Sequence, residues 1–421
     1  MQKLLTMFRI PDIRNSILFV VLMLVIFRLV AHIPVPGVDA SALAGLVEGN
    51  QFFGLLNIFS GGTLDSFSVM ALGVAPYITS SIIFQLFPMI MPKFEELQKE
   101  EAGRRKLNQW TRLATVPLAA IQAYGLTVLL SQQAGAPIAG LAGWDRVLTI
   151  FAMVVGTVLL MWIGELISEK GIGNGISLLI LAGIIAGLPT FLGQQILTFD
   201  QGSIITLVLF IAMVLVTIYA IVVMNEAQRN IPVQHARQIR GARLLGGQAN
   251  HMPLRLNPGG VIPIIFAISI ILLPTTLAQF FLEARTGWIR EMATWTLQII
   301  NDQVIYGVLY FLLVFGFTYF YAKVVFKPEQ VAENLQKSAA FVPGIRPGPP
   351  TAQYLNWVMN RLLFAGALFL SLIAVLPLVV QQFTGSANLV IGGTSILIVV
   401  AVIIDMLKQI DARITMHSYE Y

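Results

Sequence analysis

The sequence predicts an all-α polytopic membrane protein with ten transmembrane helices. Of its 421 residues, 57% are hydrophobic and only 11% are charged, whereas about 25% of the residues in ordinary soluble domains are charged. Ten apolar stretches are long enough to cross a bilayer, for which a helix needs about 17–25 residues. Their approximate bounds are 15–33, 69–91, 110–130, 147–167, 172–192, 204–224, 261–281, 304–325, 358–380 and 394–408.

The positions of the basic residues predict the orientation of these stretches. When both termini are placed on the inner side, 22 of the 26 Lys and Arg residues fall in inner segments. Arg146, Arg285 and Arg290 fall outside, and Arg28 lies within the first stretch. Membrane insertion retains Lys and Arg on the cytoplasmic side. We therefore expect cytoplasmic N- and C-termini.

The first stretch is interpreted as a retained span, because it is longer than a signal-peptide core and no small-residue cleavage site follows it. Arg28 lies about 8 Å before its end. From there its side chain can extend to the membrane surface or meet a structural partner.

Residues 52–67 are moderately apolar, yet a full crossing here would move 19 of the inner basic residues outside. The segment therefore either enters from the outer side and returns, or lies at the outer surface. Ser60-Gly61-Gly62 would interrupt a helix. Irregular backbone at membrane depth is tolerated only inside protein or against water, so a re-entrant segment would indicate an aqueous pore.

Two further patterns lie within and between the spans. The run from Gly171 to Gly175 is interpreted as a tight inner hairpin and not as a phosphate-binding loop, because it lacks the required spacing and a preceding strand. Val74, Ile78 and Ile82 recur at helical spacing, as do Ile176 and Ile180. Such stripes ordinarily face lipid or the core. Polar side chains in the spans, among them Thr79, Ser80, Gln85, Gln122, Thr275 and Thr276, could hydrogen-bond between helices or serve packing alone.

Two long inner loops, at about 225–257 and 323–361, are basic. Contact with anionic lipid would account for this. Docking of an acidic or polyanionic partner would account for it equally. The arginines concerned are Arg229, Arg237, Arg240, Arg243, Arg255 and Arg346.

No enzymatic motif occurs. The chain has no cysteine, four dispersed histidines and no Walker-type lysine, so we expect neither catalysis nor a cofactor or metal.

A secondary transporter or ion channel is one alternative function, disfavoured because a pump needs ionisable groups at depth in the membrane. Glu165 is interpreted as the interfacial end of a helix. A purely structural membrane scaffold is the second alternative.

The motifs themselves closely resemble the bacterial SecY family, whose members form the central subunit of the protein-conducting channel. The resemblance covers essentially the whole chain. It is carried by 27–28 (FR), 33–39 (IPVPGVD), 57–62 (NIFSGG), 72–78 (LGVAPYI), 103–106 (GRRK), 164–165 (GE), 169–177 (EKGIGNGIS), 186–189 (AGLP), 260–263 (GVIP), 340–348 (AFVPGIRPG) and 392–395 (GGTS).

The resemblance implies two inverted five-helix halves around a central pore, residues 1–192 and 193–421. It implies a plug on the outer side at about 55–65, comprising Leu56, Asn57, Ile58, Phe59, Ser60, Gly61, Gly62, Thr63 and Leu64. The family's pore ring would fall on Val74, Ile78, Ile176, Ile180, Ile265 and Ile398. A lateral gate would include Thr79, Gln85, Gln122, Pro274 and Thr275.

The implied function is translocation of unfolded secretory polypeptides across the bacterial inner membrane, with lateral release of apolar segments into lipid. The implied partners are the small subunits SecE and SecG, the SecA motor ATPase, the ribosome, signal peptides and nascent chains. YidC and SecDF are further candidates, and anionic lipids would contact the basic loops. The motor and the ribosome would dock on the arginines of the inner loops.

Overall fold

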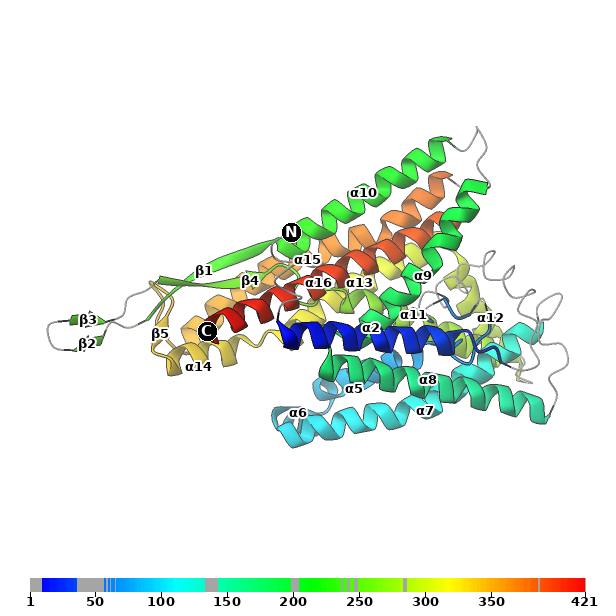
Figure 1. The fold of residues 1–421 in the computed structure, drawn as a ribbon, viewed down its shortest axis with the longest axis horizontal. Coiled ribbons are helices and arrows are strands. Elements are labelled where there is room, and N and C mark those ends of the chain that lie inside the picture. Colours follow the sequence, from blue (N-terminus) through cyan, green and yellow to red (C-terminus); the bar gives the residue numbers. More distant parts are fainter. Residues whose placement is uncertain are drawn as a thin grey trace.

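The computed structural model describes residues 10–35, 57, 60, 62–64, 66–132, 143–197, 204–235, 238–240, 243–245, 249–282, 286–384 and 387–420. Its long helices form an elongated bundle and run roughly along the long axis of the molecule (Figure 1). They are α2 (Pro11–Ala31), α5 (Ala75–Ile90), α7 (Glu101–Gln132), α8 (Trp144–Lys170), α9 (Gly175–Leu197), α10 (Ile204–Glu226), α11 (Ile262–Phe281), α13 (Gln303–Val325), α15 (Pro349–Thr384) and α16 (Ala387–Glu420).

Each predicted apolar stretch overlaps one of these helices, but the bounds differ: α5 begins six residues after the expected 69, whereas several other helices are longer than predicted. Thus α7 begins nine residues before the expected 110, and α15 begins at Pro349 inside what was expected to be a loop. Proline is favoured in the first turn of a helix, where its missing N–H would be unpaired anyway. Hydropathy detects only the part of a helix that suits lipid, so it misses polar extensions. Among the described residues, five helical stretches are long and apolar enough to cross a membrane.

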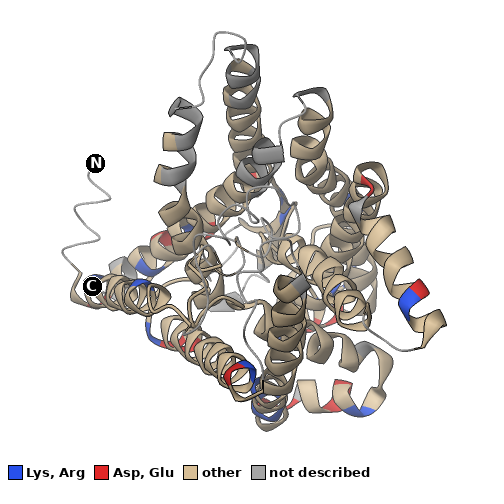
Figure 2. Ribbon diagram, turned by 90° about the vertical axis from the view of Figure 1, so that its right-hand side faces the viewer, with Lys and Arg blue, Asp and Glu red and all other residues tan. Residues whose placement is uncertain are grey.

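Shorter helices lie at the two ends of the bundle. At one end are α6 (Pro92–Lys99) and α14 (Pro328–Lys337), and at the other is α12 (Gly287–Asn301) (Figure 1). Viewed from the α12 end, the long helices surround a central region (Figure 2).

The expectation of an all-α fold is wrong at the inner loop 225–257, which forms an antiparallel ribbon. In this ribbon β1 (Gln228–His235) pairs with β4 (Ala249–Arg255), and β5 (Ala340–Phe341) pairs with the other edge of β1. At the tip, β2 (Gln238–Arg240) pairs with β3 (Arg243–Leu245). The end of the molecule that carries these strands is called the ribbon end (Figure 1).

The ribbon forms because apolar residues alternate with polar ones along β1. Ile231 and Val233 are buried, whereas Asn230 and Gln234 are exposed. A period of two places alternate side chains on one face of a strand. Ile231 packs with Leu254 of β4 against the beginning of α15, which attaches the ribbon to the bundle.

The main core lies in the centre of the bundle. One large cluster of buried apolar side chains joins α2, α5, α8, α9, α10, α11, α13, α15 and α16. A second cluster joins residues 64–72 to α7 and α8. An added Cβ at Gly156 of α8 would overlap the carbonyl of Val69, so glycine is what allows this irregular segment to pass so close to the helix.

Candidate functional site

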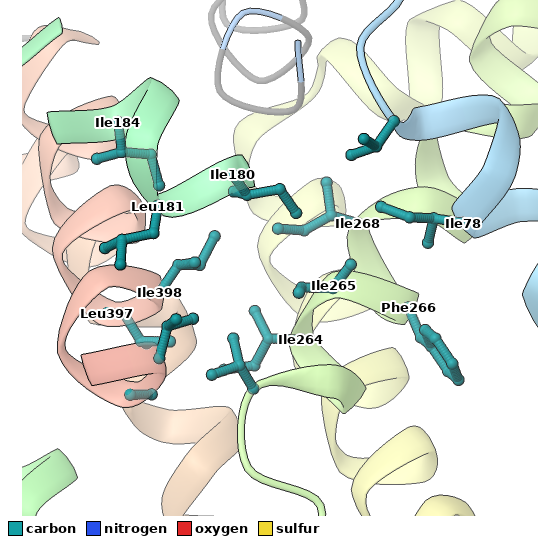
Figure 3. Packing of buried hydrophobic residues seen from close by; sticks show 14 of the residues in the cluster. Ile78, Ile180, Leu181, Ile184, Ile264, Ile265, Phe266, Ile268, Leu397 and Ile398 are labelled. Carbon is teal, nitrogen blue, oxygen red and sulfur yellow. The ribbon is translucent and has the colours of Figure 1, made fainter. Parts of the chain in front are cut away.

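The six branched aliphatic residues expected to form the pore ring lie in one cluster. Val74 and Ile78 come from the start of α5, Ile265 from α11 and Ile398 from α16. Ile176 and Ile180 come from α9. Five of the six are buried, and Ile176 is partly buried against the same cluster. Figure 3 shows Ile180, Ile265 and Ile398 close together at the junction of α9, α11 and α16, with Ile78 approaching from α5.

Further side chains complete this aliphatic cluster. Ile264 and Ile268 on α11, Leu181 and Ile184 on α9, and Leu397 on α16 are buried beside the six (Figure 3). Each lies one residue or one helical turn from a predicted member. Helical spacing from Ile180 and Ile265 could therefore have identified Ile184 and Ile268.

A cavity of about 620 Å³ lies on the ribbon-end side of the cluster. Ile78, Ile176 and Ile265 form part of its wall, and the rest of its lining is largely polar. In this wall the Nε of Arg112 on α7 lies 2.6 Å from Oε1 of Glu165 on α8. The interpretation of Glu165 as a simple interfacial helix end therefore missed its partner, which lies 53 residues away in sequence.

The turn that leads into α9 has the tight conformation predicted for Gly171–Gly175. Gly173 has φ +94°, in the region that glycine favours. Asn174 caps the helix, since its Oδ1 accepts a hydrogen bond from Ile176 N at 3.0 Å. An added Cβ at Gly175 would overlap the carbonyl of Gly164, so α8 and α9 meet here at backbone contact.

The structure describes part of the segment expected to form the plug: Asn57, Ser60, Gly62, Thr63 and Leu64. Leu56, Ile58, Phe59 and Gly61 lie outside the described residues. Ser60 and Thr63 are 1% exposed and Leu64 is 0% exposed. A loop on the outer surface would leave such side chains in contact with solvent. The described part of the segment therefore lies inside the bundle.

Hydrogen bonds hold this segment in a compact form. The Thr63 hydroxyl donates to Met70 O at 2.7 Å, and Gly62 N donates to Asn57 O at 2.8 Å. Gly62 has φ +75°, consistent with the predicted helix interruption. An added Cβ at Gly62 would lie 3.5 Å from Gly183 O of α9, between Ile180 and Ile184. The segment thus contacts the helix that supplies part of the aliphatic cluster.

The contact of α11 with α5 and α7 is called the seam. A small cavity here is lined by Thr79 of α5 and Gln122 of α7, both expected gate residues, and by Ser269, Thr276 and Gln279 of α11. The hydroxyls of Thr79, Ser269 and Thr276 each donate to the carbonyl four residues earlier in their own helix.

The other three expected gate residues do not line the seam cavity. Gln85 lies in the wall of the 620 Å³ cavity and donates to the Ser81 hydroxyl at 2.8 Å. Pro274 is exposed on α11, and Thr275 is buried with its hydroxyl bonded to Ile271 O. A one-residue step turns a helix by about 100°, so Thr276 faces the cavity where Thr275 does not.

A family model described as SecY matches residues 68–407. The chain belongs to the SecY family. It is 42% identical to the protein translocase subunit SecY of Corynebacterium glutamicum over 100% of this chain and 99% of that protein. It is also 42% identical to the protein of the same name from Escherichia coli K12, over 97% of this chain and 93% of that protein.

Solved structures share the fold. A protein-conducting channel superposes with a TM-score of 0.64 at 18% identity, covering 93% of this chain and 90% of that one. Sec61 in a canine ribosome–channel complex superposes with a TM-score of 0.60 at 17% identity over the same shares. At such low identity these likenesses concern the architecture.

In this SecY-family chain, the basic residues expected to dock partners lie at the ribbon end. Arg229 on β1, Arg255 on β4 and Arg346 after β5 are exposed. Arg240 and Arg243 are paired residues at the tip between β2 and β3, and Arg237 lies outside the described residues. Among the described residues, no group of three or more His, Asp or Glu side chains could hold a metal ion.

Proposed function

We propose that this chain is the pore-forming subunit of a bacterial protein-conducting channel. It passes unfolded secretory polypeptides across the cell membrane and releases apolar segments sideways into lipid. In this proposal ten spans form two inverted halves, residues 1–192 and 193–421, with both termini in the cytoplasm. The observation that carries the proposal is the aliphatic cluster, in which Ile78 and Ile180 of the first half meet Ile265 and Ile398 of the second.

A ring of branched aliphatic side chains suits a pore that must seal at rest. A narrow hydrophobic constriction loses its water and so closes to ions, and it offers an ion nothing to replace its hydration. The same side chains present no hydrogen-bonding groups that would hold a moving polypeptide. The polar cavity beside Ile78, Ile176 and Ile265 would receive the chain before it meets the constriction.

The plug would occupy the outer side of this constriction. The burial of Ser60, Thr63 and Leu64 and the contact of Gly62 with α9 support this role. Deletion of residues 55–65 should raise the ion conductance of the channel in planar bilayers. An unchanged conductance would count against a sealing role for the segment.

The seam would be the lateral gate. An apolar signal sequence could replace the contacts that α11 makes with α5 and α7, and it shifts the closed–open equilibrium only if it binds the open form better. Thr79, Gln122, Thr276 and Gln279 are the polar residues that such a helix would meet.

Energy for transport would come from partners, because the chain itself is proposed to have no catalytic activity. The exposed arginines Arg229, Arg255 and Arg346 would dock the SecA motor and the ribosome by phosphate and carboxylate contacts. Two of the structural neighbours are channels bound to ribosomes, Sec61 and yeast Ssh1. SecE and SecG would be the small subunits, with YidC and SecDF as further partners.

Site-specific photocrosslinking tests the proposal. A probe at Ile78 or Ile180 should form an adduct with a stalled secretory precursor, whereas a probe at Leu215, exposed on α10, should form none. A solute carrier or scaffold would give no adduct at any of the three positions, and that result would refute the channel.

A further inference from the structure

Two exposed cations, Lys323 and Arg361, lie on α13 and α15, two helices that pack against each other. The Arg361 guanidinium carbon lies 3.9 Å from the centre of the Trp357 ring, and Lys323 Nζ lies 4.9 Å from the centre of the Tyr319 ring. The Tyr319 hydroxyl donates to Asn360 Oδ1 at 3.0 Å across the two helices. This bond places the two cations within about one helical turn of each other along the bundle.

Both positive charges lack a carboxylate partner among the described residues. The described ion pairs join other residues, and Glu333 of nearby α14 pairs with Lys337 at 2.8 Å. Glu329 and Glu333 share with Lys323 the lining of a cavity of about 870 Å³, but neither of them forms an ion pair with it. The aromatic rings hold both cations in place without neutralising them.

Each cation lies near one end of a stripe of apolar side chains on the outer face of its helix. On α15 the stripe runs from Trp357 through Phe364 and Leu368 to Leu372, and Trp357, Phe364 and Leu372 are 50%, 57% and 55% exposed. On α13 it runs from exposed Val308 and Leu312 through Phe315 and Tyr319 to Lys323. The Phe315 and Phe364 rings join the two stripes, with centroids 5.9 Å apart.

The depth of the cations matches a membrane boundary. Lys323 lies 20 residues after the start of α13, and Arg361 lies 23 residues before the end of α15. At 1.5 Å per residue, these lengths of helix span about 30–35 Å, close to the roughly 30 Å thickness of the hydrocarbon core. The cations and Trp357 therefore lie where headgroups lie, and the apolar stripes lie where acyl chains lie.

We propose that this surface, the α13–α15 site, binds one anionic phospholipid. The guanidinium of Arg361 donates two parallel N–H bonds to phosphate oxygens, and Lys323 contributes a second positive charge. The acyl chains lie along the two stripes. The site adds to the proposed function, in which anionic lipid is one of the partners. It depends on that proposal only in requiring that α13 and α15 span the membrane. Free phosphate could use the same cations but would make no use of the stripes.

Photoactivatable lipids test the site in the intact channel complex, reconstituted in nanodiscs. A phosphatidylglycerol probe should label peptides of α13 and α15 about tenfold more than a matched phosphatidylcholine probe, because two basic side chains favour the anionic headgroup. Labelling of α10, which has exposed apolar residues but no Lys or Arg, should not depend on the headgroup. Equal labelling of α13–α15 by both probes would overturn the proposal.

Two variants and one competitor complete the test. The double variant Lys323→Gln/Arg361→Gln should lose the headgroup preference, whereas Lys337→Gln, which removes an exposed and already paired lysine, should keep it. Retained preference in the double variant would refute the site. Displacement of the lipid probe by millimolar inorganic phosphate would assign it to a free anion instead. Precursor crosslinking at Ile78 is a separate measurement. If a precursor failed to crosslink there while lipid labelling of α13 and α15 persisted, the channel proposal would be refuted and the lipid site would stand.

Discussion

The seam and a second contact, which we call the latch, differ in how their polar groups are bonded. In the latch, α16 meets the turn between α8 and α9: Arg413 Nη2 donates to Gly171 O at 2.9 Å, and Gly173 N donates to Gln409 Oε1 at 2.9 Å. Ile13 of α2, Ile172 and Ile410 are buried together beside these bonds. At the seam, by contrast, no hydrogen bond within the described residues joins α11 to α5 or α7.

This difference determines which contact can open. Because the seam hydroxyls bond within their own helices, separation costs mainly apolar contact, and an incoming apolar helix can restore that contact. Opening the latch would also break hydrogen bonds between segments, each worth about 0.5–1.5 kcal/mol, or about 1.5–3 kcal/mol where a charged group takes part. We therefore expect the bundle to open at the seam while the latch stays closed.

A covalent bond across the seam should have the largest effect. An added Cβ at Gly125 of α7 would lie 3.5 Å from Cγ2 of Thr276, so the side chains of two cysteines at these positions would meet, and the chain has no cysteine of its own to interfere. Oxidised Gly125→Cys/Thr276→Cys should block precursor export almost completely, and reductant should restore it. Each single variant should export with or without oxidant. Full export by the oxidised pair would show that the seam need not open.

Adding one methyl group should destabilise the turn that α16 contacts more than it destabilises the seam. Gly175→Ala places a carbon into the carbonyl of Gly164 and should lower the free energy of unfolding by about 1–3 kcal/mol or more. Gly125→Ala meets only ordinary contacts at 3.5 and 3.6 Å and should be nearly neutral. Denaturation of the two purified variants measures the difference. Equal stabilities would mean that the turn before α9 yields as easily as the seam.

Loss of the latch arginine should have a moderate effect. Arg413→Ala removes a charged donor from Gly171 O and should lower the free energy of unfolding by about 1–3 kcal/mol. Arg105→Ala is the matched control, because the one ion pair of Arg105 among the described residues is with Glu101 on an exposed helical turn, and such pairs contribute about 0.3–0.5 kcal/mol. If both substitutions cost the same, the latch is no stronger than a surface ion pair.

The smallest effect should come from a single seam hydroxyl. Thr79→Val keeps the shape of the side chain and makes the closed seam more apolar. A shift of about 1 kcal/mol or less in the gate equilibrium corresponds to roughly two- to fivefold slower export of precursors with weakly apolar signals. Thr115→Val removes an equivalent hydroxyl, buried on α7 and bonded to Thr111 O outside the seam cavity. The Thr115→Val control should leave export unaffected. If it slowed export as much as Thr79→Val does, the effect of Thr79→Val could not be assigned to the gate.

Hydropathy and charge were enough to predict where the helices lie, because lipid imposes the same requirement on every span. The glycine turn before α9 was also predictable, since the conformation of Gly173 is a local property. The ribbon was missed because Ile231 and Val233 form a very short alternation inside a polar loop. The Arg112–Glu165 pair was not predictable, because nothing local in the sequence relates residues on different helices.

The aliphatic cluster shows a different limit of sequence reasoning. Ile78 and Ile180 have the spacing of any core or lipid-facing stripe, so only the family resemblance distinguished them. Among the expected gate residues, Thr79 and Gln122 line the seam, whereas Pro274 and Thr275 do not. The family motifs identified α11 correctly as a gate helix candidate, but which of its residues face the seam depends on how the helix is rotated about its axis.

The glycine-to-glycine approach of Gly62 and Gly183 has a kinetic consequence. Neither residue has a side chain, so if this segment is the plug, as proposed, no rotamer change at Gly62 or Gly183 is needed when it moves along α9. Few steric barriers should therefore oppose movement of the segment at this point. Closure of the proposed channel after each polypeptide has passed should then be limited by diffusion of this short tethered segment. Bulkier residues at Gly62 or Gly183 should slow both its departure and its return.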